Sequence, residues 1–168
     1  SSYLPSSFKN MVCEYVGDYN HGTGELHDIG YDNLDIFING LLSGQGAPEP
    51  TIERELDMVF YQKTPARIVF EMAEMTGIKA GDIFFDMGSG LGQVVLLVNL
   101  ISGAISIGIE YEPAYCSYAN KCASQLNLQD VAFINADARV ADYSEGTIFF
   151  MYTPFGGRIL QEVLQILK

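Results

Sequence analysis

Apolar residues in the C-terminal part of the chain form short runs separated by stripes of helical spacing. The runs predict strands at 83–86, 105–110, 131–135 and 147–152. The stripes predict helices at 92–102, at 113–127 and from Ile159 to Leu167. Strands that alternate with helices are typical of βαβ units with right-handed crossovers. The pattern therefore predicts the α/β fold class, with a doubly wound and mostly parallel sheet.

The N-terminal part of the chain follows a different pattern. Residues 1–30 are rich in Gly, Ser, Tyr and Asn, which predicts loops with at most one short element. Apolar residues from Leu34 to Leu41 recur at helical spacing after Asp32 or Asn33, either of which can cap a helix. This spacing predicts one helix in the region.

Two further helices are predicted before the first strand. Two glycines and two prolines in 43–50 indicate a linker. A helix is expected to follow from Thr51 to about Val59, and another from Thr64 to Gly77. We expect residues 1–58 to form a loop and helical cap over a ligand pocket, and residues 59–168 to form the ligand-binding domain.

A glycine-rich turn follows the first predicted strand, with the sequence Asp86-Met87-Gly88-Ser89-Gly90-Leu91-Gly92. Glycines at alternate positions carry no Cβ, so a ligand can lie against the backbone. The helix after the turn offers unpaired N–H groups and partial positive charge. At the carboxyl end of a parallel strand, such a turn is typical of a nucleotide-binding site. The alternative is a turn with a structural role only.

Two acidic residues narrow the kind of ligand. Asp86 ends the first strand, where a carboxylate would repel the pyrophosphate of a dinucleotide and attract an ammonium or sulfonium group. The third glycine, Gly92, comes one position earlier than in the fingerprint G-x-G-x-x-G, so Gln93 stands in its place. Glu110 ends the next strand, where a carboxylate can accept hydrogen bonds from ribose hydroxyl groups. The pattern favours a nucleoside that carries a positive charge.

The composition narrows the class of protein. The chain of 168 residues suits one domain, and no apolar stretch is long enough to span a bilayer. A net charge of −12 disfavours nucleic acid as a partner. Three cysteines without metal spacing and the lack of a signal peptide indicate a cytoplasmic protein. No metal site is expected, because His21 and His27 have too few neighbouring ligands.

The order of strand, acid, three glycines, helix, strand and acid resembles motif I of the class I S-adenosylmethionine-dependent methyltransferases. Tyr61-Gln62-Lys63-Thr64-Pro65 and the Gly-Gln-Val-Val at 92–95 narrow this resemblance. From about Val59 to Phe155 the chain is similar to the disruptor-of-telomeric-silencing family of non-SET histone lysine methyltransferases and its bacterial relatives. The resemblance implies a Rossmann-like fold, S-adenosylmethionine as cofactor and S-adenosylhomocysteine as product. It also implies further C-terminal strands, which we expect to be absent here, so that a partner chain or another segment covers the apolar edge of the sheet.

The resemblance also implies roles for individual residues. Tyr61 and Thr64 would fold over the methionine end of the cofactor, which Gln93 would also contact. In class I methyltransferases an acid after the third strand faces the adenine amino group, and the next backbone N–H meets a ring nitrogen. Asp137 and Ala138 match these positions. A turn or a helix cap is the alternative role for Asp137.

The last predicted strand leads into the segment where this family shapes its acceptor channel. Phe155-Gly156 fits the pattern of the family, but Met151 and Tyr152 replace a pair of asparagines found in the histone enzymes. The resemblance therefore suggests a protein lysine as acceptor only weakly. Tyr152 and Phe155 could form an aromatic wall beside the sulfonium, because ring faces attract cations. The alternative is that both are core residues under the last helix.

These observations predict an S-adenosylmethionine-dependent methyltransferase with a protein or small-molecule acceptor and a capacity to form oligomers through the open sheet edge. The predicted cofactor-binding residues are Tyr61, Thr64, Asp86, Gly88, Gly90, Gln93, Glu110, Asp137 and Ala138. Tyr152 and Phe155 are predicted to line the acceptor channel. An NAD-dependent oxidoreductase and a catalytically silent cofactor-binding domain are the alternatives.

Overall fold

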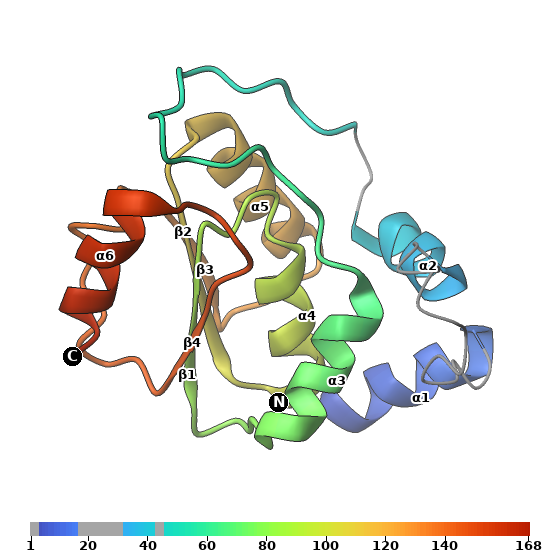
Figure 1. The fold of residues 1–168 in the computed structure, drawn as a ribbon. Helices are drawn as coiled ribbons and strands as arrows, with labels where there is room; N and C mark the ends of the chain where they lie inside the picture. The colour runs from blue at the N-terminus through green and yellow to red at the C-terminus, as the bar shows by residue number, and fades with distance from the viewer. Residues whose placement is uncertain (1–3, 17–31, 43–45) are drawn as a thin grey trace, which may run out of the picture.

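The computed structural model describes residues 4–16, 32–42 and 46–168 (Figure 1). The expectations for residues 17–31 and 43–45, including those for His21 and His27, lie outside the described residues.

A sheet of four parallel strands forms the centre of the domain. The strands are β1 (Ile83–Met87), β2 (Ile105–Glu110), β3 (Val131–Asn135) and β4 (Ile148–Phe150). Their order is β3-β2-β1-β4, and every neighbouring pair is parallel. The strand order therefore reverses between β1 and β4, which is where open α/β sheets bind their ligands. The predicted α/β fold class and parallel sheet are confirmed.

The two edge strands differ from the central ones. β4 is shorter than the predicted strand over 147–152, because the chain turns after Phe150 and Thr153 adopts a left-handed φ of 46°. Phe149 on β4 and Ile134 on β3 are exposed. Both edges thus present apolar side chains, and the oligomer expected through a sheet edge stays a prediction.

Helices cover both faces of the sheet. α3 (Ala66–Thr76), α4 (Gln93–Ser102) and α5 (Pro113–Gln125) lie on one side, to the right of the sheet in Figure 1. α6 (Gly157–Ile166) lies on the other side. The bounds of α4 agree with the prediction, and α3 ends at Gly77, whose left-handed φ of 63° is typical of a helix C-terminus.

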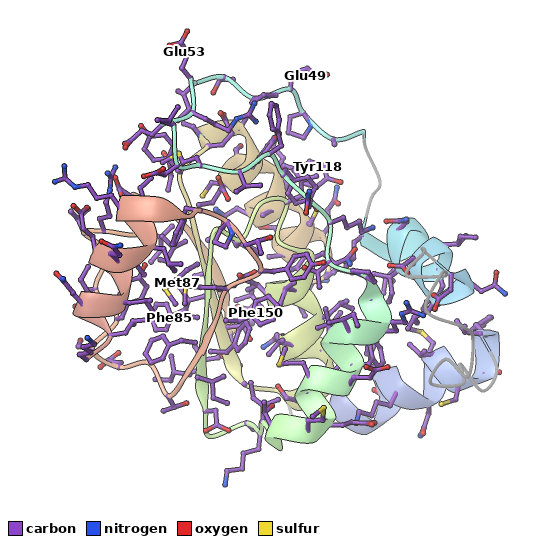
Figure 2. The ribbon with its side chains drawn as sticks, in the orientation of Figure 1. Glu49, Glu53, Phe85, Met87, Tyr118 and Phe150 are labelled. Atoms are coloured by element: carbon purple, nitrogen blue, oxygen red, sulfur yellow. The ribbon has the colours of Figure 1, made fainter. Side chains whose placement is uncertain are left out.

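Alternate residues of β1 enter two separate cores. Phe84 packs into a core with α3 and α4, whereas Phe85 and Met87 pack with Val163 of α6. Figure 2 shows Phe85 and Met87 on the α6 side of the sheet and Phe150 on the opposite side. A strand buried on both faces reads as a continuous apolar run, which is why β1 was predictable from the sequence.

Among the described residues, α1 (Leu4–Val16) and α2 (Asn33–Leu42) precede α3. The prediction for α2 is confirmed, but the expectation of only loops and one short element before it is wrong, because α1 has 13 residues. Phe8 and Val12 lie one turn apart on α1 and are buried in the core that also contains α3 and α4. Tertiary burial of this face stabilises a helix whose sequence alone favours loops.

The helix predicted from Thr51 to about Val59 is wrong, since this segment is extended. We call residues 50–64 the strap; Figure 1 shows it crossing above α5 before it enters α3. Apart from one turn, in which the N–H of Met58 donates to the carbonyl oxygen of Glu55, its backbone groups bond to distant partners. The N–H groups of Thr51 and Ile52 donate to the Glu112 carboxylate, and the N–H of Val59 donates to the carbonyl oxygen of Pro154.

Candidate functional site

The glycine turn lies between β1 and α4 and is packed from two sides. Gly88, Gly90 and Gly92 have φ values of 84°, 54° and 85°, a region that glycine adopts at little cost. A Cβ on Gly88 would lie 2.2 Å from the Cβ of Pro154, and one on Gly90 would lie 2.4 Å from the ring of Tyr61. The turn therefore contacts the strap on one side and the loop between β4 and α6 on the other.

A cleft of about 110 Å³ opens beside this turn at the carboxyl edge of the sheet. A second cavity of about 30 Å³ adjoins it. Every predicted site residue lines one of the two: Gly90, Glu110, Asp137, Ala138 and Phe155 line the larger, Thr64, Asp86 and Gln93 line the smaller, and Tyr61, Gly88 and Tyr152 line both. The structure thus brings all of the predicted residues together, while their roles remain predictions.

Among the described residues of 1–58, those that line the cleft belong to the strap, and the expected loop and helical cap stays a prediction. Residues of α1 and α2 do not line the cleft; these helices pack on α3 and α4 instead. The strap lines the cleft with Ile52, Met58 and Tyr61, among other residues. The N-terminal helices are present, but an extended segment covers the site.

Asp86 is the last residue but one of β1, Glu110 is the last residue of the neighbouring strand β2, and the two interact electrostatically. Asp86 is 3% exposed, and its burial, with a smaller effect of Glu110, raises its pKa to about 8. Burial also raises the pKa of Glu110, although its carboxylate accepts hydrogen bonds from the N–H groups of Glu112, at 2.8 Å, and Gly90, at 2.7 Å. A cation beside this pair would favour the ionised form of both carboxyl groups.

The hydrogen bond between Gly90 and Glu110 disfavours a dinucleotide as the ligand. The N–H groups of a glycine turn hold the pyrophosphate in dinucleotide-binding proteins. Here the N–H of Gly90 already donates to Glu110, which puts a carboxylate where a phosphate would have to lie. The geometry therefore gives no support to the alternative of an NAD-dependent oxidoreductase.

Gln93 ties the strap to the first turn of α4. Its side-chain amide donates a hydrogen bond of 2.7 Å to the carbonyl oxygen of Thr64, and both side chains are buried. The residue that stands in the place of a third fingerprint glycine thus contacts the end of the strap. This bond fixes the relative position of two predicted cofactor contacts.

Asp137 follows β3 and forms a bidentate pair with Arg139. Arg139 donates from Nε to Asp137 Oδ1 at 2.9 Å and from Nη2 to Oδ2 at 2.5 Å, and this hydrogen bonding lowers the pKa of Asp137. The same guanidinium contacts the Glu55 carboxylate of the strap at 2.5 and 3.0 Å. Asp137 also accepts the N–H of Arg139, so the turn role left open by the sequence is present beside its place in the cleft.

Glu112 is a site residue that the sequence reasoning missed. Its carboxylate accepts the N–H and hydroxyl groups of Thr51 and the N–H groups of Ile52 and Ala114. Burial raises the pKa of Glu112, but these hydrogen bonds outweigh burial, so the net shift is downward. Its place directly before Pro113 is typical of a helix N-cap and was the one signal available.

Tyr152 and Phe155 occupy the turn after β4. Phe155 packs in the core under α6 and also lines the cleft, so the core position is confirmed and its role in the acceptor channel stays a prediction. Tyr152 is 42% exposed and lines both cavities, which disfavours a core role.

Charge and polarity in the two cavities favour a cationic ligand. Among the described residues, the carboxylates of Asp86, Glu110, Glu112 and Asp137 line them, against the single guanidinium of Arg54. Ser89 Oγ is buried without a hydrogen-bond partner and lines the smaller cavity. An unpartnered buried hydroxyl costs free energy, which a polar ligand group in that cavity would recover.

Other features of the described residues exclude further kinds of site. In that part of the chain, no group of three or more His, Cys, Asp or Glu side chains could hold a metal ion. None of its helices combines the length and apolarity that crossing a bilayer requires. Cys13, Cys116 and Cys122 are unpaired thiols.

Comparison with known proteins identifies the family. Residues 57–146, more than half of the chain, match the family described as "Histone methylation protein DOT1". No curated protein matches the chain significantly.

Solved structures show the same fold. An RNA methyltransferase from Salinibacter ruber, in complex with S-adenosyl-L-homocysteine, is 32% identical with a TM-score of 0.58 over 63% of this chain and 69% of that chain. A SAM-dependent methyltransferase from Geobacter sulfurreducens, also in complex with S-adenosyl-L-homocysteine, is 18% identical (TM-score 0.52, 61% of this chain and 44% of that chain). A putative S-adenosyl-L-methionine-dependent methyltransferase from Methanococcus maripaludis is 19% identical (TM-score 0.53, 61% and 50%). This chain spans half or less of the length of the last two, and at such identity the likeness shows the fold alone.

The family match confirms the predicted resemblance and, together with the Salinibacter ruber structure, the class of cofactor. The solved structures confirm the Rossmann-like methyltransferase fold. The chain belongs to the DOT1 family, and its domain is that of an S-adenosylmethionine-dependent methyltransferase.

Proposed function

We propose that the cleft binds S-adenosylmethionine and that its methyl group passes to a nucleophile presented between the strap and the turn after β4. The observation that carries this proposal is the pair of buried carboxyl groups of Asp86 and Glu110. They end two adjacent parallel strands on either side of the glycine turn, and both line the connected cavities. A positively charged nucleoside is the ligand that such a pair suits best.

The residues present fit this cofactor in chemistry as well as in position. The Glu110 carboxylate accepts backbone N–H groups, among them those of Gly90 and Glu112, and still has room among the roughly four acceptor positions of a carboxylate for a ribose hydroxyl group. Asp86 would face the ammonium or sulfonium group, and Ser89 Oγ could bond to the methionine end. Arg139 keeps Asp137 ionised, so that it can accept a hydrogen bond from the adenine amino group.

Bound S-adenosylmethionine supplies a methyl group that is already activated. The work of the chain is therefore to hold an acceptor lone pair in line with the bond from sulfur to the methyl carbon and to exclude water. Positioning of this kind can contribute roughly 7–11 kcal/mol to lowering the barrier. Tyr152 and Phe155 line the part of the cleft where their ring faces could attract the cation. The new bond forms as the carbon–sulfur bond breaks, and the electron pair of the broken bond stays on sulfur.

Charge is the best guide to the acceptor. The chain has a net charge of −12, and the strap carries the three acidic residues Glu53, Glu55 and Asp57. Such a surface repels a nucleic-acid backbone and attracts a basic polypeptide or a small amine. We therefore propose an acceptor of this kind in preference to RNA. The unpaired thiols of the chain favour a reducing compartment, and we propose the cytoplasm.

Labelled methyl transfer tests this function. The chain is incubated with S-adenosylmethionine labelled in its methyl group and, separately, with basic polypeptides, small amines and total RNA. Label in the polypeptide or amine fraction is the expected result, and label in RNA alone would overturn the proposed acceptor. Binding of the cofactor without transfer to any of them would identify a silent cofactor-binding domain instead.

A further inference from the structure

The strap and the turn after β4 are joined along their backbones. Met58 and Phe155 form an antiparallel bridge. On one side of it the N–H of Val59 donates to the carbonyl oxygen of Pro154 at 3.1 Å, and on the other the N–H of Gly156 donates to the carbonyl oxygen of Asp57 at 2.8 Å. The two segments therefore form a short ribbon at the cleft, although they lie far apart in the sequence.

Asp57 also caps α6 with its side chain. The residue at the N-cap position of α6 is Gly156, which has no side chain to accept the first N–H groups. Asp57 Oδ2 accepts the N–H of Arg158 at 3.0 Å instead. A Cβ on Gly157, whose φ is +48°, would lie 2.6 Å from the Asp57 carboxylate, so the helix start and the strap are in direct contact.

The turn after β4, which precedes the contacts of Asp57, contains a residue in a strained backbone conformation. Thr153 adopts a left-handed φ of 46°, a conformation that costs a non-glycine residue free energy and persists only when its surroundings enforce it. Tyr152 and Phe155, the predicted walls of the acceptor channel, flank it. The contacts made by Asp57 lie directly after this turn, at the start of α6.

The strap reaches the cofactor side of the cleft within a few residues of Asp57. Tyr61 lies against Gly90 of the glycine turn, and its ring packs edge-on against Tyr115 at 5.8 Å between centroids. One short segment thus contacts the predicted cofactor site through Tyr61 and the acceptor channel through Asp57. If a ligand orders Tyr61, this short stretch of chain would transmit the ordering to Asp57.

We propose that Asp57 is a positioning residue for the acceptor channel. It couples the strap to the turn after β4. Cofactor binding therefore reduces the motion of the segment that carries Tyr152 and Phe155 before the acceptor binds. This inference rests on the proposed function, since it requires that the cleft bind the cofactor. It assigns to Asp57 no contact with the cofactor or with the reacting atoms.

Hydrogen exchange of single amides, measured by NMR with and without S-adenosylhomocysteine, tests the coupling. In the wild-type chain the ligand should slow exchange at Thr51 in the strap, and also at Gly156 and Arg158, by about fivefold. In Asp57→Ala the ligand should still slow exchange at Thr51 but no longer at Arg158, whose N–H loses its side-chain acceptor. Asp57→Asn should restore the coupling, because asparagine is an equally good helix cap.

Glu53→Ala is the matched control. Glu53 lies on the same strap and is exposed, and Figure 2 shows its side chain pointing away from the molecule. This variant should behave as the wild type does. A merely structural role for Asp57 predicts faster exchange in Asp57→Ala to the same extent with and without the ligand, which would overturn the proposal.

The wild-type measurement decides the matter even if Asp57→Ala fails to fold. Protection of the strap without any change at Gly156 and Arg158 would overturn the coupling while leaving the proposed function intact. No protection anywhere, together with no heat of binding in calorimetry, would instead count against the proposed function itself.

Discussion

Glu110 accepts a hydrogen bond of 2.7 Å from the backbone N–H of Gly90, so the acid that ends β2 is tied to the glycine turn that follows β1. This bond fixes the end of β2 relative to the turn that follows β1. Burial raises the pKa of Asp86, and the nearby carboxyl group of Glu110 adds a smaller effect in the same direction.

Replacing Asp86 should change how stability depends on pH. Burial raises the folded-state pKa of Asp86 to about 8 from the ordinary 3.8, so stability from this group is fully present below about pH 4 and is lost as the pH rises through 8. Asp86→Asn should remove this loss and stabilise the ligand-free protein at pH 8 by a few kcal/mol, on the order of 1.4 kcal/mol per pKa unit. Urea denaturation at several pH values measures the free energy of unfolding of both proteins. If that free energy depended on pH between 5 and 8 in the same way in Asp86→Asn and in the wild type, the prediction would be contradicted.

Cofactor binding should release a proton at neutral pH. Asp86 is largely protonated there in the ligand-free protein, and a cation beside it would lower its pKa. Calorimetry with S-adenosylmethionine, in buffers of different ionisation enthalpy, should show this release in the wild type and not in Asp86→Asn. Equal apparent enthalpies in all buffers for the wild type would contradict the assigned protonation state.

An alanine at Gly88 should impair both folding and binding. Its φ is +84°, and a Cβ would lie 2.2 Å from the Cβ of Pro154. We expect Gly88→Ala to lower the free energy of unfolding by about 1–3 kcal/mol and to weaken S-adenosylhomocysteine binding. Gly81→Ala is the matched control, because nothing lies within 4 Å of a Cβ there. Thermal denaturation of both variants measures the difference, and equal stability would argue against a close approach of Pro154.

Loss of the Glu112 carboxylate should release the start of the strap. It accepts the N–H groups of Thr51, Ile52 and Ala114, and the last of these caps α5. Glu112→Ala should cost about 0.5–2 kcal/mol of stability, as for other helix caps, and speed hydrogen exchange at Thr51 and Ile52. Because the pKa of Glu112 is lowered, the same contribution should disappear in the wild type as the pH falls below 4.5. Unchanged exchange at Thr51 in the variant would contradict this role.

The sequence predicted the parts of the fold whose determinants are local. β1 and β2 are apolar runs that end at Asp86 and Glu110, and α4 lies between two glycines with left-handed φ, so their limits were visible in the pattern. Motif spacing placed both acids at the carboxyl edge of a parallel sheet. The structure brings them to connected cavities, as that spacing implied.

The strap could not be predicted because its partners are distant. Thr51 reads as a helix cap, yet its N–H and hydroxyl groups bond to Glu112, which lies 61 residues further on. Arg139 links Asp137 to Glu55 across a similar distance, with no local signal. α1 was missed for a related reason, since burial of Phe8 and Val12 against other helices outweighs the loop-like composition of the segment.

The most direct measurement is the affinity of the chain for S-adenosylhomocysteine by calorimetry, with wild type, Glu110→Ala and the surface control Glu53→Ala. The account predicts that the wild type and Glu53→Ala bind equally well, and that Glu110→Ala binds at least tenfold more weakly, as expected for the loss of a charge-assisted hydrogen bond of about 1.5–3 kcal/mol. No binding by the folded wild type, or equal Kd values for all three proteins, would contradict it.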